Sequence, residues 1–148
     1  MEEIKASDLM IGNRIFRKYY NPEPNNETYA YHEVQVIGIY KDTIYCTPID
    51  SKQILKIKDA YPIPLTEDIL LKAGAKRLGE NKVAIMLNDP STHLILMRIG
   101  THWYPEIEQI GEFISDGVNT VHLNFIDYVH QAQRLFKSLT GNDLKIEV

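Results

Sequence analysis

The sequence predicts an α+β fold made of antiparallel strands, one short helix and a closing C-terminal helix. Apolar and polar side chains alternate in short runs over residues 14–58, as in half-buried strands. A proline-rich connector at residues 61–64 then precedes a short helical segment. Residues 125–139 carry apolar side chains three and four positions apart, which predicts an amphipathic helix. Together these patterns predict strands first, then a helix, more strands and a last helix.

The first sixty residues predict a small antiparallel β-barrel, SH3-like and partly open. A helical turn from Ser7 or Asp8 ends at Gly12-Asn13 and is followed by four strands, at residues 14–20, 29–40, 43–47 and 52–58. Lys41-Asp42 fits a tight turn between the second and third strands. Because residues 21–27 hold two prolines and three asparagines, we expect strand pairing to pause there.

The remaining residues predict helices and strands in alternation. Thr66 caps a helix over residues 67–73, and Gly74 ends it. Strands are expected at residues 82–87, 92–99 and 103–107, and residues 113–114 and 118–123 flank a hairpin turn at Asp116-Gly117. Asn124 is expected to cap the last helix, which ends at Gly141. We predict a β-rich subdomain at residues 1–61 and an α+β subdomain at 62–148, packed as one compact unit.

Charge and cysteine content exclude several classes of protein. The 148 residues contain 16 Lys+Arg and 20 Asp+Glu, a net charge of -4, which disfavours a phosphate-binding surface. Apolar runs such as residues 94–97 are too short for a membrane span. The acidic N-terminal segment lacks an apolar signal region, so we expect a cytoplasmic protein. The single cysteine, Cys46, is expected to pack in the interior.

No motif predicts a catalytic, metal or cofactor site. The five histidines include no pair four positions apart, as a zinc-protease helix requires. A nucleophile elbow, a phosphate-binding loop and a dinucleotide-binding glycine pattern are all missing from the sequence. We therefore expect no catalytic residue, no metal and no cofactor, and a small hydrolase ranks third among the functions considered.

Two groups of side chains are candidates for binding. A polar stripe on the last helix would contact a protein partner, although a solvated helix face gives the same pattern; it comprises Asp127, His130, Gln131 and Arg134. A group of cations with a tyrosine in the first sixty residues would bind single-stranded nucleic acid by stacking and charge; it comprises Arg14, Arg17, Lys18, Tyr19, Lys56 and Lys58. Carboxylates in the same segment, and the tendency of strand tyrosines to be half-buried, disfavour nucleic acid.

Three stretches in order along the chain support a family resemblance. They are residues 9–13 (LMIGN), residues 62–67 (PIPLTE) with 70–74 (LLKAG), and residues 128–131 (YVHQ) with Gln133, Leu135 and 139–141 (LTG). This pattern resembles small uncharacterised proteins of Bacteroidetes prophages and other mobile elements. The resemblance implies a cytoplasmic protein with no catalytic residues to carry over. The leading hypothesis is a non-enzymatic accessory protein acting by protein–protein interaction. The alternative is a weak nucleic-acid-binding module; the oligomeric state stays open.

Overall fold

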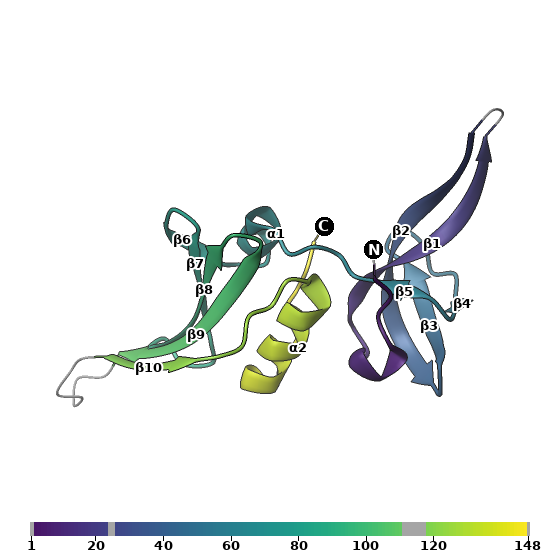
Figure 1. The fold of residues 1–148 in the computed structure, drawn as a ribbon. Helices are drawn as coiled ribbons and strands as arrows, with labels where there is room; N and C mark the ends of the chain where they lie inside the picture. The colour runs from purple at the N-terminus through teal and green to yellow at the C-terminus, as the bar shows by residue number, and fades with distance from the viewer. Residues whose placement is uncertain (1, 24–25, 111–117, 148) are drawn as a thin grey trace. The chain divides into compact units, whose positions relative to one another are not determined.

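The computed structural model describes residues 2–23, 26–110 and 118–147, and it shows a mostly β protein with two five-stranded antiparallel sheets (Figure 1). The elements in chain order are η1 (Ala6–Asp8), β1 (Arg14–Glu23), β2 (Asn26–Tyr40), β3 (Thr43–Pro48), β4 (Leu55–Ile57), β5 (Ala60–Tyr61), α1 (Glu67–Lys72), β6 (Lys76–Gly79), β7 (Lys82–Met86), β8 (Thr92–Ile99), β9 (His102–Ile110), β10 (Val118–His122) and α2 (Val129–Thr140). The short helix, the C-terminal helix and the antiparallel strands of the prediction are confirmed.

The chain forms two compact units. The first unit comprises residues 1–64 and 128–134, and the second comprises residues 65–127 and 135–148. Each unit contains one of the two sheets.

The sheet of the first unit has the strand order β4-β3-β2-β1-β5. Its longest ladder joins β1 to β2, from the pair Arg14–Gln35 to the pair Glu23–Asn26, and forms the long hairpin in Figure 1. The prediction that pairing pauses at residues 21–27 is therefore wrong. Beyond Arg17, β1 has no pairing with β5, and a strand edge tolerates a proline because no neighbour needs the missing N–H. Residues 24 and 25 of that predicted loop lie outside the described residues.

The other strands of this sheet follow the prediction in part. The tight turn at Lys41-Asp42 is confirmed, with Lys41 at a φ of 56°. β4 is shorter than predicted, and β5 was not predicted: it is only two residues long and pairs with β1 at Phe16 and Arg17. β4 and β5 end the strand order, so the described residues form no closed barrel.

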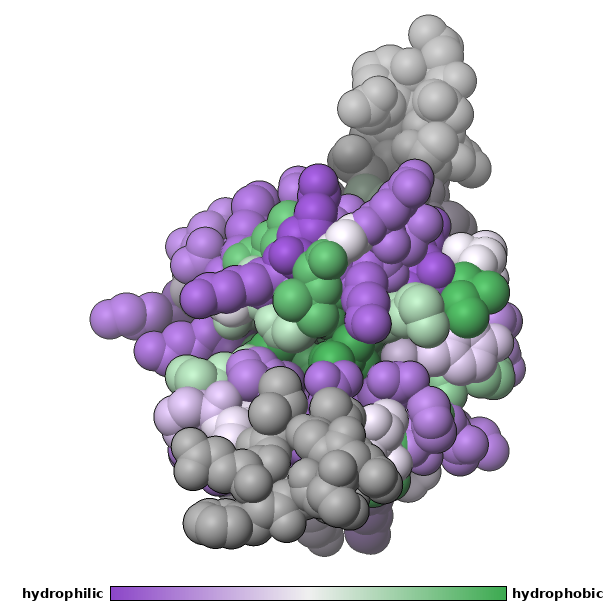
Figure 2. All heavy atoms as spheres, turned by 90° about the vertical axis from the view of Figure 1, so that its left-hand side faces the viewer, coloured by the Kyte–Doolittle hydropathy of each residue, from purple (hydrophilic) through white to green (hydrophobic). Residues whose placement is uncertain are grey.

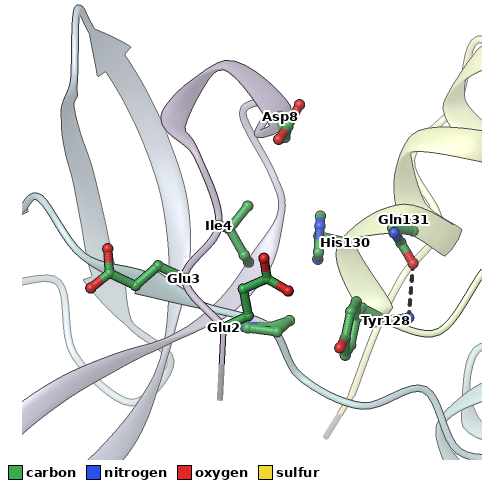
Figure 3. A pocket seen from close by; sticks show the side chains of 8 residues that line it. Glu2, Glu3, Ile4, Asp8, Tyr128, His130 and Gln131 are labelled. Atoms are coloured by element: carbon green, nitrogen blue, oxygen red, sulfur yellow. Dashed lines mark hydrogen bonds between the residues drawn. The ribbon is translucent and has the colours of Figure 1, made fainter.

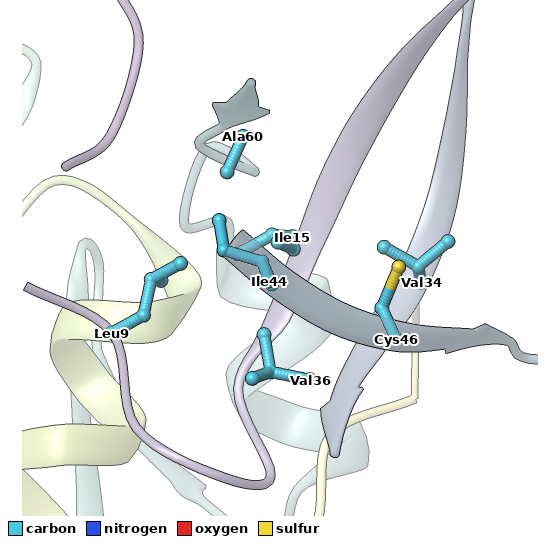
Figure 4. Close-up of a cluster of buried hydrophobic side chains, with 7 residues drawn as sticks. All are labelled: Leu9, Ile15, Val34, Val36, Ile44, Cys46 and Ala60. Atoms are coloured by element: carbon cyan, nitrogen blue, oxygen red, sulfur yellow. The ribbon is translucent and has the colours of Figure 1, made fainter. Parts of the chain in front are cut away.

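The core of the first unit lies on one face of this sheet (Figure 4). Seven buried side chains form it: Leu9, Ile15, Val34, Val36, Ile44, Cys46 and Ala60. The predicted interior position of Cys46 is confirmed, and burial raises the pKa of its thiol. Burying a Val, Leu or Ile side chain contributes about 1.5–3 kcal/mol, so the five such side chains of this cluster stabilise the unit.

The first half of α2 is anchored to the first unit by Gln133. Its Nε2 donates to the carbonyl of Gly12 (3.1 Å), and its Oε1 accepts from the N–H of Arg14 (2.8 Å). The helix begins at Val129, four residues after the predicted start at residue 125. The preceding segment is extended because Ile126 exchanges two backbone hydrogen bonds with Trp103, a pairing that helical periodicity does not reveal.

The sheet of the second unit has the order β10-β9-β8-β7-β6. Its central strands are covered on both faces, because three successive residues are buried in β7 (83–85) and in β8 (94–96). The predicted strands over residues 82–123 are present, β8 with the predicted bounds, whereas β6 was not predicted. All four β6 residues are exposed, so the strand shows no alternation of apolar and polar side chains. The predicted segment at residues 113–114 and the predicted turn at Asp116-Gly117 lie outside the described residues.

The α1 cap is formed as predicted: Thr66 Oγ1 accepts from the N–H of Ile69 (3.2 Å), and Gly74 follows the helix at a φ of 105°. Several large hydrophobic side chains of the second unit are exposed, among them Leu78, Met86 and Ile99. Figure 2 shows one face of the molecule, where hydrophobic side chains lie among hydrophilic ones. Within the described part of the chain, no helix has the length and apolar character needed to cross a membrane.

Candidate binding sites

Aromatic side chains gather on the face of the first sheet opposite its core. Alternation along β1 places Phe16, Lys18 and Tyr20 opposite the buried Ile15. We call the group the tyrosine face; it comprises Phe16, Lys18, Tyr20, Tyr29, Tyr31 and Tyr61 from β1, β2 and β5. Because these strands are hydrogen-bonded neighbours, the side chains form one continuous surface.

Ring contacts order the tyrosine face. The centroids of Tyr20 and Tyr29 are 5.7 Å apart, and those of Tyr31 and Tyr61 are 5.4 Å apart, both pairs edge to face. Lys18 Nζ lies 4.3 Å from the centroid of the Tyr29 ring. Tyr61 is 7% exposed, whereas Tyr20, Tyr29 and Tyr31 are 48%, 60% and 41% exposed. The face therefore has a buried aromatic base and an accessible aromatic surface.

The structure divides the predicted nucleic-acid patch between the two faces of the sheet. Lys18 is on the tyrosine face, and Arg14 lies on the same side in an ion pair with Glu33 (3.0 Å). Arg17 and Tyr19 lie on the other side, where Arg17 Nε donates to Nδ1 of His32 (3.4 Å).

The two lysines of the predicted patch lie at or after the opposite edge strand. Lys56 is in β4, with its Nζ 5.7 Å from the centroid of the Tyr45 ring. Lys58 follows β4 and is exposed. The six predicted residues therefore do not form a single cationic surface.

The predicted polar stripe of the last helix contains side chains in different environments. His130 is buried, with only 6% exposed, whereas Arg134 is exposed. Gln131 Oε1 accepts from the N–H of Tyr128 (3.1 Å), which caps the start of α2. Asp127 belongs to the second unit, where its Oδ1 lies 2.6 Å from Nδ1 of His102.

A pocket of about 210 Å³ lies within the first unit (Figure 3). Its N-terminal wall contains Glu2, Glu3 and Asp8, of which Glu3 directs its carboxylate away toward Tyr61, and its other wall contains Tyr128 and His130 at the start of α2. Ile4, Pro62 and Gln131 complete the lining. We call this cavity the acidic pocket.

His130 differs from the other residues of the acidic pocket in being a buried titratable group. Its ring lies nearly parallel to that of Tyr128, at 11° and 6.0 Å between centroids. Burial, opposed by the charge of Asp8 and assisted by that of Arg134, lowers the pKa of His130 to about 4. The imidazole is therefore neutral at pH 7. Its Nδ1 is buried and has no hydrogen-bond partner among the described residues.

The sequence alone does not predict the acidic pocket, because its walls are far apart in the chain. The acidic start of the sequence is visible, as is the polar character of residues 128–131. More than a hundred residues separate them, and no periodic pattern indicates that they converge. The backbone pairing of Pro64 with Tyr128 is what brings the start of α2 into the first unit.

The second unit contains a histidine–carboxylate pair, His102 and Asp127, with the ring of Phe125 at 4.2 Å from that of His102. Hydrolases use such a pair to activate a nucleophile. In the described part of the chain, no serine, threonine or cysteine hydrogen-bonds to His102. No group of three or more possible metal ligands occurs within residues 2–23, 26–110 and 118–147.

Comparison of the chain with protein-family models, with curated proteins and with solved structures gives no match. The resemblance to prophage proteins stays a prediction.

Proposed function

We propose that the chain is a cytoplasmic, non-enzymatic accessory protein of a mobile element that binds another protein through its tyrosine face. The observation that carries this proposal is the continuous surface of Tyr20, Tyr29 and Tyr31, each more than 40% exposed. Tyrosine is enriched at protein interfaces because it offers a large amphipathic surface at a small loss of conformational entropy. The sequence resemblance supports the link to mobile elements.

The framework of the proposed interface is the partly open, SH3-like barrel of the prediction. The strand order, with β5 returning to pair with β1, is consistent with that topology. Backbone ladders and edge-to-face contacts hold the tyrosine rings in place before a partner binds. A surface ordered in advance loses less entropy on association.

Charge favours a protein over a nucleic acid as the partner. Glu33 neutralises Arg14, and Glu3 accepts a hydrogen bond from the hydroxyl of Tyr61 (3.2 Å). Phosphate binding depends on releasing counterions from several phosphates, which requires several available cations. Lys18 is the one cationic member of the tyrosine face as defined above.

The second candidate function is binding of single-stranded nucleic acid. The observation that favours it is Lys18 over the ring of Tyr29, because a base stacks on an exposed aromatic ring beside a cation. A surface of this kind would bind oligonucleotides with little sequence preference and with strong salt dependence.

Site-specific photocross-linking in cells tests the proposal. A photoreactive phenylalanine replaces Tyr29 in one variant and Tyr40 in the control; Tyr40 is also on β2 and is 65% exposed, but lies outside the tyrosine face. We expect a discrete protein adduct from position 29, lost in the Tyr20→Ser background, and none from position 40. Equal adducts at both positions would contradict the proposal. Salt-sensitive oligonucleotide binding that is lost in Tyr29→Ser would favour the second candidate.

A further inference from the structure

We infer that the acidic pocket binds the guanidinium group of an arginine side chain presented by the protein partner. The inference rests on the proposed function for the nature of the partner, and on the pocket itself for the chemistry of the contact. Neither the tyrosine face nor the predicted polar stripe includes the N-terminal carboxylates that form one wall of this pocket.

The charge of the lining indicates a cationic ligand. Glu2 and Asp8 contribute two carboxylates to one small cavity, whereas the Glu3 carboxylate points away from it toward Tyr61, and none of the lining residues within the described part of the chain is a lysine or an arginine. Figure 3 shows Asp8 and Glu2 directed toward the space in front of α2. Like charges held close together repel one another, so a cation placed among them is stabilised. Carboxylate oxygens also accept hydrogen bonds from the planar, multiply donating guanidinium group.

His130 provides a second and independent indication of a ligand. His130 is only 6% exposed and lines the pocket. Its Nδ1 lacks a hydrogen-bond partner within the described residues. Buried polar atoms are nearly always hydrogen-bonded, because leaving one unpaired is unfavourable. Since the ring is neutral at pH 7, one of its nitrogens is an acceptor. In the tautomer with its proton on Nε2, Nδ1 is that acceptor, and a ligand N–H group supplies the donor that it needs.

The shape and the aromatic wall favour arginine over lysine. A guanidinium group stacks on aromatic rings while it donates in its own plane, whereas an ammonium group is compact and strongly hydrated. The Tyr128 ring lies beside His130 in the lining, which allows stacking and hydrogen bonding at the same time. A volume of about 210 Å³ suits one side chain rather than a folded segment.

Glu3 links the acidic pocket to the tyrosine face. Glu3 lines the pocket, and its Oε1 accepts the hydrogen bond from the hydroxyl of Tyr61 at the base of the face. Both sites lie in the first unit. One partner segment can therefore cover the exposed tyrosines and place an arginine in the pocket.

The test is a titration of the full chain with N-acetyl-arginine amide, followed by NMR at the ring protons of His130. N-acetyl-citrulline amide, which has nearly the same shape without the charge, and N-acetyl-lysine amide are the comparison ligands. We expect saturable shifts with the arginine ligand and at least about fivefold weaker binding of the other two. Equal binding of the citrulline ligand, or of the lysine ligand, would overturn the inference.

Variants of the exposed carboxylates show whether the pocket is responsible. Asp8→Asn and Glu2→Gln each remove one charge, and both residues are exposed enough for the fold to tolerate the change. We expect each substitution to weaken binding of the arginine ligand about fivefold. Glu80→Gln, at an exposed site in the second unit, should leave the binding unchanged. Unchanged binding in Asp8→Asn and Glu2→Gln would refute the assignment to this pocket.

The same experiments separate the inference from the proposed function. Arginine binding that survives in Tyr29→Ser, combined with no cross-linked partner at position 29, would refute the proposed function and leave the pocket established. A cross-linked partner without arginine binding would refute the inference alone.

Discussion

Lowering the pH should destabilise the protein through His130, by an amount that follows from its burial. The pKa of this group falls from 6.5 to about 4 on folding. Between these values the unfolded chain binds more protons than the native state, so stability decreases as the pH falls through this window. The groups near the ring are Asp8, which favours the charged imidazole, and Arg134, which opposes it; Glu2 and Glu3 line the same pocket.

The size of the effect follows from proton linkage. At pH 5.0 the His130 site binds nearly one proton in the unfolded chain and about a tenth of a proton in the native state. Integrated from pH 7.5 to 5.0, this difference removes about 2 kcal/mol from the free energy of unfolding. Little of the effect comes from ordinary carboxylates, whose usual pKa values lie near 4.

Urea unfolding at the two pH values measures the loss, and a non-titrating variant isolates the contribution of His130. When the pH is lowered from 7.5 to 5.0, we expect the free energy of unfolding of His130→Leu to fall by about 2 kcal/mol less than that of the parent protein. His122→Leu is the matched control, since this histidine side chain is 75% exposed, and it should behave as the parent. The reasoning would be refuted if parent and His130→Leu lost the same stability, or if the His130 ring protons titrated near pH 6.5.

Three further predictions concern the stability of the two units, each measured by urea unfolding. Gln133→Leu leaves two backbone groups near the start of β1 without partners and should cost about 2–3 kcal/mol, whereas exposed Gln53→Leu should be nearly neutral. Ile44→Ala opens a cavity in the first core and should cost about 3–4 kcal/mol, against a much smaller effect of Ile54→Ala at a side chain 64% exposed. Thr66→Ala removes the α1 cap and should cost about 1 kcal/mol, with Thr66→Ser retaining most of the stability.

The elements that the sequence predicted well depend on local patterns. β8 has the predicted bounds because hydrophobic residues and turn signals delimit it, and α1 has the predicted cap because Thr66 bonds within its own first turn. β5 and β6 were missed for different reasons: one is two residues long, and the other is exposed throughout. Strands held by pairing alone leave little trace in hydrophobic periodicity.

The binding sites show the same limit. Side chains alternate along β1, which places Arg14 and Lys18 on one side of the strand and Arg17 on the other. The division of the predicted cationic patch therefore follows from the positions of these residues in the sequence. The acidic pocket depends instead on contacts between the first eight residues and residues 128–131. The burial of His130 could not be predicted from the polar stripe of α2. Helical periodicity shows which residues share a face, but not which of them a distant segment covers.

Two buried polar residues of α2, His130 and Gln133, allow a structural role to be separated from a binding role. Gln133 uses its amide nitrogen and oxygen on backbone groups, whereas Nδ1 of His130 remains unpaired within the described residues. Replacing an unpaired buried polar group by an apolar one of similar size is neutral or stabilising, whereas replacing a paired one is destabilising. At pH 7.5 we therefore expect His130→Leu to retain the parent's stability and to lose arginine binding, and Gln133→Leu to lose stability. If His130→Leu destabilises the protein as much as Gln133→Leu, then the imidazole is a structural group with partners of its own. His130 would then not be the unpaired acceptor on which the proposed arginine recognition depends.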